Sequence, residues 1–232
     1  MPASRHDTRP PPGLLLVIDG LDGAGKSTLI AGLARHLTQR EVVLSREPTY
    51  GPYGRQLRDS AASGRLSAER EIELFVQDRT EHVRELIAPA LARGAIVILD
   101  RYYYSSVAYQ ADYGSPESIL AQFTGFAPKP DLALILDLPV AVAIGRIHAR
   151  GAGQNDFEHT DTLSRCRDRF AWVLANCPET RRLDADRPPA AVLAEALGQI
   201  VLCCVARAKA CQPDPSDQAC ELAWLLDRAA SG

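Results

Sequence analysis

The stretch LLLVIDGLDGAGKSTLIAGLARHL, residues 14–37, decides the fold of this chain. Within it, residues 20–28 contain the phosphate-loop pattern G-x-x-x-x-G-K-[ST] with every fixed position matched. A short apolar run precedes the loop and leucines at helical spacing come after it, so we expect a strand, a loop and a helix. Glycines let backbone N–H groups converge on an anion, Lys26 neutralises phosphate charge and Ser27 can ligate Mg²⁺. The pattern predicts that the chain binds a nucleoside triphosphate.

A glycine-rich turn that merely joins a strand to a helix is the alternative interpretation of this loop. The chain contains only three lysines, Lys26, Lys129 and Lys209, so abundance gives little reason for a lysine to fall at the required position. The flanking sequence and the lysine together favour the phosphate loop.

Length and composition limit the class of protein. A chain of 232 residues, 46% hydrophobic and 24% charged, suits one globular domain. The formal net charge of -3 gives no electrostatic case for a nucleic-acid polymer as partner. The six cysteines lack the paired spacing of a zinc site and are interpreted as free thiols. Residues 1–13 lack the apolar core of a secretory signal, and no uninterrupted apolar run approaches a membrane span, so we expect a cytoplasmic protein without a membrane partner.

Short apolar runs alternate with amphipathic segments after a Pro-rich leader at residues 1–12, which is expected to be disordered. The pattern predicts strands at 14–19, 42–46, 95–100, 132–138 and 180–183. It predicts helices near 27–39, 69–93, 105–125, 140–150, 160–176 and 188–208. Continuous apolar strands separated by helices indicate an α/β three-layer sandwich, in which a five-stranded parallel sheet is flanked by helices. Such sheets bind ligands at the carboxyl ends of their strands.

The predicted helix 69–93 carries a cation on its apolar stripe. At 100° per residue, Arg79 projects within about 40° of the centre of that stripe, and Phe75 lies one turn earlier beside it. One interpretation is structural: the arginine extends its charged end past the apolar stripe to water, or it pairs with a core carboxylate. The other is functional: the arginine and the aromatic ring together contact a flat ligand. The residues alone leave these alternatives open.

The third predicted strand ends in Asp100 and Arg101, at the edge where active-site groups are expected. Asp100 can orient Mg²⁺ and Arg101 can clamp a phosphate with two hydrogen bonds. The alternative is a local salt bridge between neighbours. The phosphate loop favours the catalytic interpretation.

Five stretches, taken in order, resemble those of thymidylate kinases, which are P-loop nucleoside monophosphate kinases. They are IDGLDGAGKST at 18–28, SREP at 45–48, LFVQDR at 74–79, DRYYYSSVAYQ at 100–110 and PDLALILDLP at 130–139. The resemblance implies a P-loop domain at residues 13–205 and transfer of the γ-phosphoryl group of ATP to the 5′-phosphate of dTMP with Mg²⁺. It also implies a homodimer.

The resemblance assigns roles residue by residue. Catalytic roles would fall to Lys26, Asp100, Arg101 and Arg150, and Ser27 and Asp100 would hold the metal. The ATP phosphates would be bound by Gly20, Leu21, Asp22, Gly23, Ala24, Gly25, Lys26, Ser27 and Thr28. Asp22 would also lie near the sugar hydroxyl, with Arg46 and Arg101 on the acceptor phosphate, Phe75 stacked on the base, Arg79 on a base carbonyl, Tyr109 under the deoxyribose, and Ser105, Ser106 and Gln110 selecting base and sugar.

A mobile lid at 146–158 is also implied by the resemblance. Arg146 and Arg150 are i, i+4 neighbours at the end of a helical pattern, and glycines loosen the residues after Arg150. Both arginines could instead simply complement the helix C-terminus. The phosphate loop has no basic residue at 22–24, and in this family a lid arginine usually serves in that case, so we favour Arg150 for the phosphoryl group.

Two departures from the family pattern stand out. After SREP the chain reads TYGPYGRQLR, where the family commonly has Gly-Gly-Thr, so the acceptor pocket is expected to differ. Residues 206–232 form a C-terminal extension of unassigned role, in which 219–230 has the pattern of a short amphipathic helix.

Three alternative functions are compatible with the same residues. One is a kinase of this fold that acts on another nucleoside monophosphate or on a deoxynucleoside. Another is a nucleotide switch that hydrolyses its ligand slowly. The chain lacks the N-K-x-D guanine signature, which argues against this alternative. The third is a binding module without turnover, which the intact Lys26, Arg46 and Arg101 disfavour.

Overall fold

The sheet is parallel and five-stranded, as predicted. A computed structural model describes residues 12–64, 66–110, 113–149 and 156–211. The strands are β1 (Leu14–Gly20), β2 (Val42–Arg46), β3 (Ile96–Asp100), β4 (Leu132–Asp137) and β5 (Thr180–Asp184). They lie in the order β2-β3-β1-β4-β5, and every neighbouring pair is parallel.

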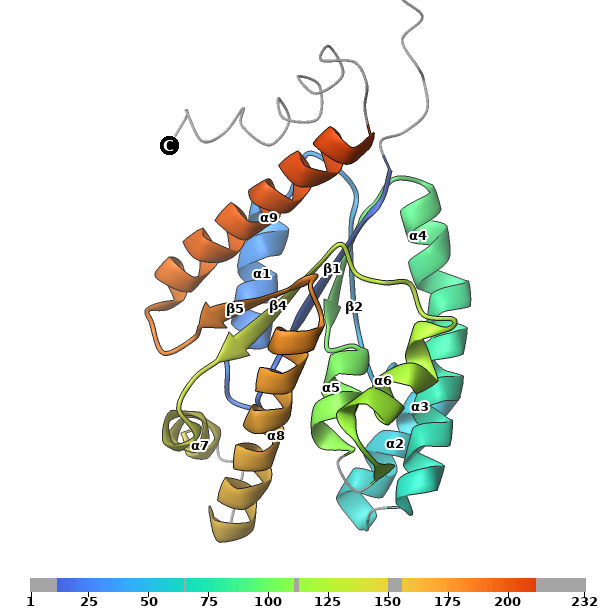
Figure 1. Cartoon of the computed structure of the whole chain (residues 1–232), viewed down its shortest axis with the longest axis vertical. Helices are drawn as coiled ribbons and strands as arrows, with labels where there is room; N and C mark the ends of the chain where they lie inside the picture. Colours follow the sequence, from blue (N-terminus) through green and yellow to red (C-terminus); the bar gives the residue numbers. More distant parts are fainter. Residues whose placement is uncertain (1–11, 65, 111–112, 150–155, 212–232) are drawn as a thin grey trace, which may run out of the picture.

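Helices cover both faces of this sheet (Figure 1). Their bounds are α1 (Lys26–His36), α2 (Pro52–Ser63), α3 (Ala68–His82), a π-helical turn η1 (Val83–Ile87), α4 (Ala88–Ala92), α5 (Tyr103–Tyr109), α6 (Pro116–Thr124), α7 (Val140–His148), α8 (Asp156–Asn176) and α9 (Pro189–Cys211). The helices α1 and α9 pack together, whereas α8 packs against α5 (Figure 1). This is the three-layer α/β sandwich that the sequence predicted.

The central strands are buried on both faces. Every residue of β1 is buried, and β3 is buried up to its last residue, whereas β2 at the edge is half-buried or exposed. Continuous apolar runs are expected in a parallel sheet covered on both sides. The register pairs Asp100 with Ile18 of β1 and with Arg46 of β2. The carboxyl ends of three strands therefore meet beside the phosphate loop.

The predicted helices differ from the observed ones in two places. The sequence analysis missed α2, which begins with Pro52 in its first turn after the extended Gly51. The predicted helix 105–125 is divided into α5 and α6, because Ser115 caps a new helix that starts at Pro116. The predicted helix 69–93 is one helical path, interrupted by the π-helical turn of η1.

Helix α9 qualifies the expectation that no segment approaches a membrane span. Among the described residues, Pro189–Lys209 is one helix whose length and composition would allow it to cross a membrane. One side of this helix packs against β4, β5 and α1. The buried share of its apolar window is 22%, so packing on the sheet explains the apolar residues on one side of the helix and not its whole composition. The described cysteines Cys166, Cys177, Cys203 and Cys204 are free thiols, as predicted.

Asp137 at the end of β4 ties α8 to the sheet. It accepts hydrogen bonds from Arg167 Nε of α8 at 2.7 Å and from Arg182 Nε of β5 at 2.7 Å. Burial alone would raise the pKa of Asp137, but these two arginines hold the pKa below its usual value. A carboxyl whose pKa is lowered by folding stabilises the fold above its unfolded pKa and loses that contribution as the pH falls.

We expect Asp137→Asn to lower the free energy of unfolding by about 1 kcal/mol at pH 7, since both arginines are partly solvated. Chemical denaturation of both proteins from pH 7 down to pH 3 measures this difference. It should shrink as the wild-type carboxyl becomes protonated. A difference that stays constant down to pH 3 would contradict the role of the charged carboxylate.

Candidate active site

The phosphate loop lies between β1 and α1, and its backbone uses glycine where other residues would be strained. Gly23 and Gly25 have φ values of 83° and 95°, in the left-handed region. A Cβ on Gly23 would lie 2.5 Å from the carbonyl oxygen of Ala143 in α7, so the loop and α7 approach at backbone distance. The glycines at 23 and 25 are therefore explained by the conformation of the loop and, for Gly23, by its packing against α7.

Lys26 is buried at the start of α1 and its ammonium points back into the loop. Nζ donates to the carbonyl oxygens of Gly20 at 3.1 Å and Leu21 at 2.8 Å. Burial, reinforced by the charge of Arg101, lowers the pKa of Lys26 to about 8. The charged form of an ammonium group that is removed from water in this way is stabilised when a polyanion binds beside it.

A cavity of about 380 Å³ opens beside the loop and is lined by seven side chains that were predicted to be catalytic or phosphate-binding. They are Asp22 of the loop, Lys26, Ser27 and Thr28 of α1, Arg46 of β2, Asp100 at the end of β3, and Arg101 after it. Three cationic side chains thus converge on one space. Such a concentration of positive charge next to a phosphate loop suits two phosphate groups that must approach each other.

Arg101 is held in this cavity by a network from three elements. Its backbone has a φ of 71°, which is rare outside glycine, and its N–H donates to Ile18 at 3.0 Å. The guanidinium donates to Asp22 at 2.5 Å and to Ser105 at 2.9 Å, and it lies over the Tyr109 ring at 5.0 Å. Backbone strain kept at one position by so many contacts is typical of a functional arginine.

Asp19, near the end of β1, holds the residues around Arg101 in place. It is fully buried and accepts hydrogen bonds from the backbone N–H of Gly20 at 2.9 Å and Tyr102 at 3.3 Å and from Ser105 Oγ at 2.6 Å. Burial raises the pKa of Asp19 more than Arg101 lowers it. The residue links the end of β1 to the start of α5.

A second cavity, of about 430 Å³, continues from Asp22 and Arg101 towards α3 and α5. It is lined by apolar and aromatic side chains together with eight polar or charged residues. Those named in the sequence analysis are Asp22, Phe75, Arg79, Arg101, Ser105, Tyr109 and Gln110. A cavity that combines aromatic rings with polar groups suits an aromatic heterocycle and a sugar.

Arg79 lies in the wall of this second cavity and is 1% exposed. Its Nε donates to Glu47 Oε2 at 2.7 Å, and its Cζ lies 4.2 Å from the centroid of Phe123. Although burial alone would raise it, Arg79 and His82 hold the pKa of Glu47 below its usual value. Pairing with a core carboxylate, one of the alternatives, is therefore what the structure shows.

Three polar atoms of residues that line the second cavity are buried and have no hydrogen-bond partner within the described residues. They are Nη1 of Arg79, Nη2 of Arg58 and Oε1 of Gln110. The two guanidinium nitrogens are donors and the amide oxygen is an acceptor. Buried polar atoms normally have partners, so Arg79 Nη1 and Gln110 Oε1 point to a ligand that accepts from the arginine and donates to the amide.

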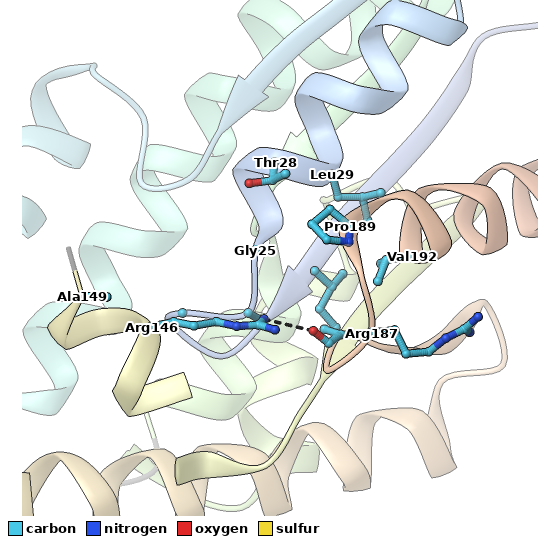
Figure 2. Close-up of a pocket in the computed structure, with 12 residues that line it drawn as sticks. Gly25, Thr28, Leu29, Arg146, Ala149, Arg187, Pro189 and Val192 are labelled. Carbon is cyan, nitrogen blue, oxygen red and sulfur yellow. Dashed lines mark hydrogen bonds between the residues drawn. The ribbon is translucent and has the colours of Figure 1, made fainter. Parts of the chain in front are cut away.

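A third cavity, of about 370 Å³, lies on the other side of the phosphate loop (Figure 2). Gly25, Thr28 and Leu29 line one side, and Arg187, Pro189 and Val192 line another (Figure 2). Arg146 of α7 donates to the carbonyl oxygen of Ala185 at 3.0 Å across this cavity. The sequence analysis missed the lining residues of 185–192. They follow β5, and the rule that parallel sheets bind ligands at the carboxyl ends of their strands could have indicated them.

The structure does not bring every predicted residue into the cavities. Ser106 is buried behind the second cavity, where its hydroxyl accepts from Arg79 Nη2 at 3.5 Å. Arg150, favoured for the phosphoryl group, lies outside the described residues, as does part of the predicted lid at 146–158. Arg146 lines the third cavity. Glu47, His82 and Asp19, which organise the predicted groups, were not singled out from the sequence.

A parallel sheet with a phosphate loop after β1, a cationic cavity and an adjoining second cavity with aromatic side chains defines the class of P-loop nucleotide kinases. Residues 18–196 match the family model described as Thymidylate kinase. The chain belongs to the thymidylate kinase family and is a phosphotransferase.

Curated relatives agree with this family. The chain is 53% identical over 193 residues to a thymidylate kinase of Xanthomonas campestris pv. campestris (strain B100), a match that covers 82% of this chain and 84% of the relative. It is 47% identical over 198 residues to a thymidylate kinase of Xylella fastidiosa (strain M12), covering 84% of this chain and 90% of the relative.

Proposed function

We propose that this chain transfers the γ-phosphoryl group of ATP to the 5′-phosphate of dTMP, forming ADP and dTDP, with the acceptor in the second cavity and the donor on the phosphate loop. The observation that carries the acceptor assignment is the pair of unpartnered atoms, Arg79 Nη1 and Gln110 Oε1. Thymine offers a carbonyl oxygen to the first and an N–H to the second. Phe75 in the same wall supplies an aromatic face for the base.

The transfer is catalysed by positioning and by charge. Lys26 neutralises the donor phosphates, while Arg46 and Arg101 hold the acceptor phosphate in the same cavity. An acceptor oxygen attacks the γ-phosphorus in line, and the bond to the β-phosphate oxygen breaks, so ADP leaves. Asp22 and Tyr109, which are in contact at 3.3 Å, would lie beside the sugar of the acceptor. The third cavity suits the adenine base of the donor.

The residues beside the phosphate loop also suit Mg²⁺. Asp100 Oδ1 is buried with no hydrogen-bond partner among the described residues, and Ser27 lines the same cavity. Mg²⁺ is usually held by one or two protein oxygens together with substrate phosphates and water. When bound, the metal would neutralise charge on the β- and γ-phosphates. Ser27 and Asp100 would hold it.

A panel of acceptors tests the proposed function. We expect ADP release with MgATP to be fastest with dTMP, and kcat/KM with dCMP to be at least about 100-fold lower. The reason is that cytosine presents a donor and an acceptor in the reverse order, which leaves two buried groups unmatched. The panel includes dUMP, dGMP, CMP, UMP and thymidine. A clear preference for dCMP, or for thymidine, would assign the fold to a different acceptor.

The pKa of Lys26 gives a second prediction. At pH 8 about half of the Lys26 side chains are neutral, and bound phosphates raise the pKa, so MgADP binding should take up protons. Calorimetry in two buffers of different ionisation enthalpy measures this uptake. At pH 8 we expect the wild type to take up as much as about 0.5 proton for each MgADP bound. Lys26→Met should lack this contribution, since it has no ammonium at this position. Equal uptake in both proteins would contradict the lowered pKa.

We also propose a homodimer and a cytoplasmic location, both on the resemblance to thymidylate kinases. A light-scattering mass of twice the 25.2 kDa of one chain tests the first. Nucleotide substrates are the small-molecule partners in this proposal.

A further inference from the structure

Alternate residues of the segment that continues from β2 are tied to α3. The hydroxyl of Ser45 lies 2.8 Å from His82 Nε2, and Thr49 donates to Asp78 through its backbone N–H at 2.8 Å and its hydroxyl at 2.6 Å. Glu47 between them pairs with two residues of α3. In an extended segment successive side chains point to opposite sides. The segment is therefore fixed against α3 on one side.

Arg46 projects from this fixed segment into the phosphate cavity. Its Nη1 donates to the phenol oxygen of Tyr50 at 3.4 Å, and its Cζ lies 5.9 Å from the centroid of the same ring. Within the described residues the phenol is the hydrogen-bond partner seen for this guanidinium. Arg46 is otherwise exposed.

Tyr50 is itself supported from the other side, although it is 67% exposed. The Cζ of Arg58 lies 4.5 Å from the ring centroid, and Arg58 is fixed by donating to the carbonyl oxygen of Pro48 at 2.8 Å. Thr49, the residue before Tyr50, is held by Asp78. The tyrosine thus connects Arg58, which lines the second cavity, with the guanidinium of Arg46 in the phosphate cavity.

We propose that Tyr50 is a positioning residue that holds Arg46 ready for the phosphate of the acceptor. A long side chain that is held in place beforehand loses less conformational freedom when its ligand binds. The inference rests on the proposed function, because it takes the acceptor to be a nucleoside monophosphate. The family commonly has a Gly-Gly-Thr run at this point, and glycine cannot supply the ring. On this proposal, the departure from the family pattern at TYGPYG, residues 49–54, has a function in binding the acceptor.

The test compares the binding of dTMP with that of thymidine, which lacks the phosphate, by calorimetry. We expect Tyr50→Ala to raise the Kd of dTMP about fivefold, the size of an exposed contact between a cation and a ring, and to leave the Kd of thymidine within about twofold. Tyr50→Phe should recover the part due to the ring. In an Arg46→Ala background, Tyr50→Ala should have no further effect, since its partner is absent.

Tyr53→Ala is the matched control, because Tyr53 lies in α2 and lines neither the phosphate cavity nor the second cavity. It should leave the ratio of the two Kd values unchanged. Equal weakening of dTMP and thymidine by Tyr50→Ala, or an undiminished effect in the Arg46→Ala background, would overturn the proposal. If the wild type prefers another monophosphate, the acceptor assignment is wrong. The role of Tyr50 is then tested separately, by comparing the Kd of that monophosphate with the Kd of its nucleoside.

Discussion

Replacing Lys26 by alanine should lower kcat by about 10²–10³-fold while the fold remains intact. The ammonium is the cation of the phosphate loop, and it has no neighbour of the same kind that could replace it within the loop. Burial lowers its pKa to about 8, so at pH 7 the charged form is less stable in the folded chain than in the unfolded one. We therefore expect the melting temperature to stay the same or to rise.

Lys129→Ala is the matched control for this experiment. Lys129 pairs with Glu179 at 3.0 Å but its side chain is 63% exposed, and it lies away from the cavities. Its replacement should leave kcat within about twofold of the wild type. Near-full activity of Lys26→Ala would contradict the assignment of the phosphate loop, whereas loss of its fold would contradict the predicted stability.

Arg79→Met should have the largest effect on stability and should also impair acceptor binding. The substitution leaves Glu47 buried with His82 as its remaining partner. Breaking a buried ion pair by removing one partner typically costs about 3–5 kcal/mol. It also removes the unpartnered donor that we assign to the base. Chemical denaturation measures the first effect, and the Kd of dTMP measures the second.

Two further variants separate these effects. Glu47→Gln combined with Arg79→Met should recover part of the stability, because the uncompensated charge is gone, but it should not recover dTMP binding. Arg70→Met removes an exposed pair with Glu73 and should change stability by less than about 0.5 kcal/mol. If Arg79→Met is as mild as Arg70→Met, the buried pair does not hold the wall of the second cavity.

The central strands β1, β3 and β4 could be predicted from the sequence because they are continuous apolar runs, which burial on both faces requires. Helix α2 was missed although its residues follow a helical period, because its composition is polar on average and no apolar run marks it. The sequence analysis also joined α5 to α6, since the cap at Ser115 was not weighed against the apolar pattern. Local signals at helix ends are weaker than the periodicity of the core.

The predicted site residues came from motifs that carry chemistry, and most of them converge on two adjoining cavities. What could not be predicted is how they are held. The pairing of Glu47 with Arg79 joins residues that are 32 positions apart, and nothing in the local pattern indicates it. Ser106, predicted to select base and sugar, instead contacts the guanidinium of Arg79. Long-range polar contacts of this kind depend on the tertiary fold.

The fate of the γ-phosphoryl group tests the central claim most directly. The chain is incubated with Mg²⁺, dTMP and ATP labelled at the γ-phosphorus, and the labelled products are separated. We predict that the label appears in dTDP in an amount equal to the ADP formed, and that Lys26→Ala forms almost none. Label found as inorganic phosphate, at a rate independent of dTMP, would contradict phosphoryl transfer and identify a nucleotide hydrolase or switch.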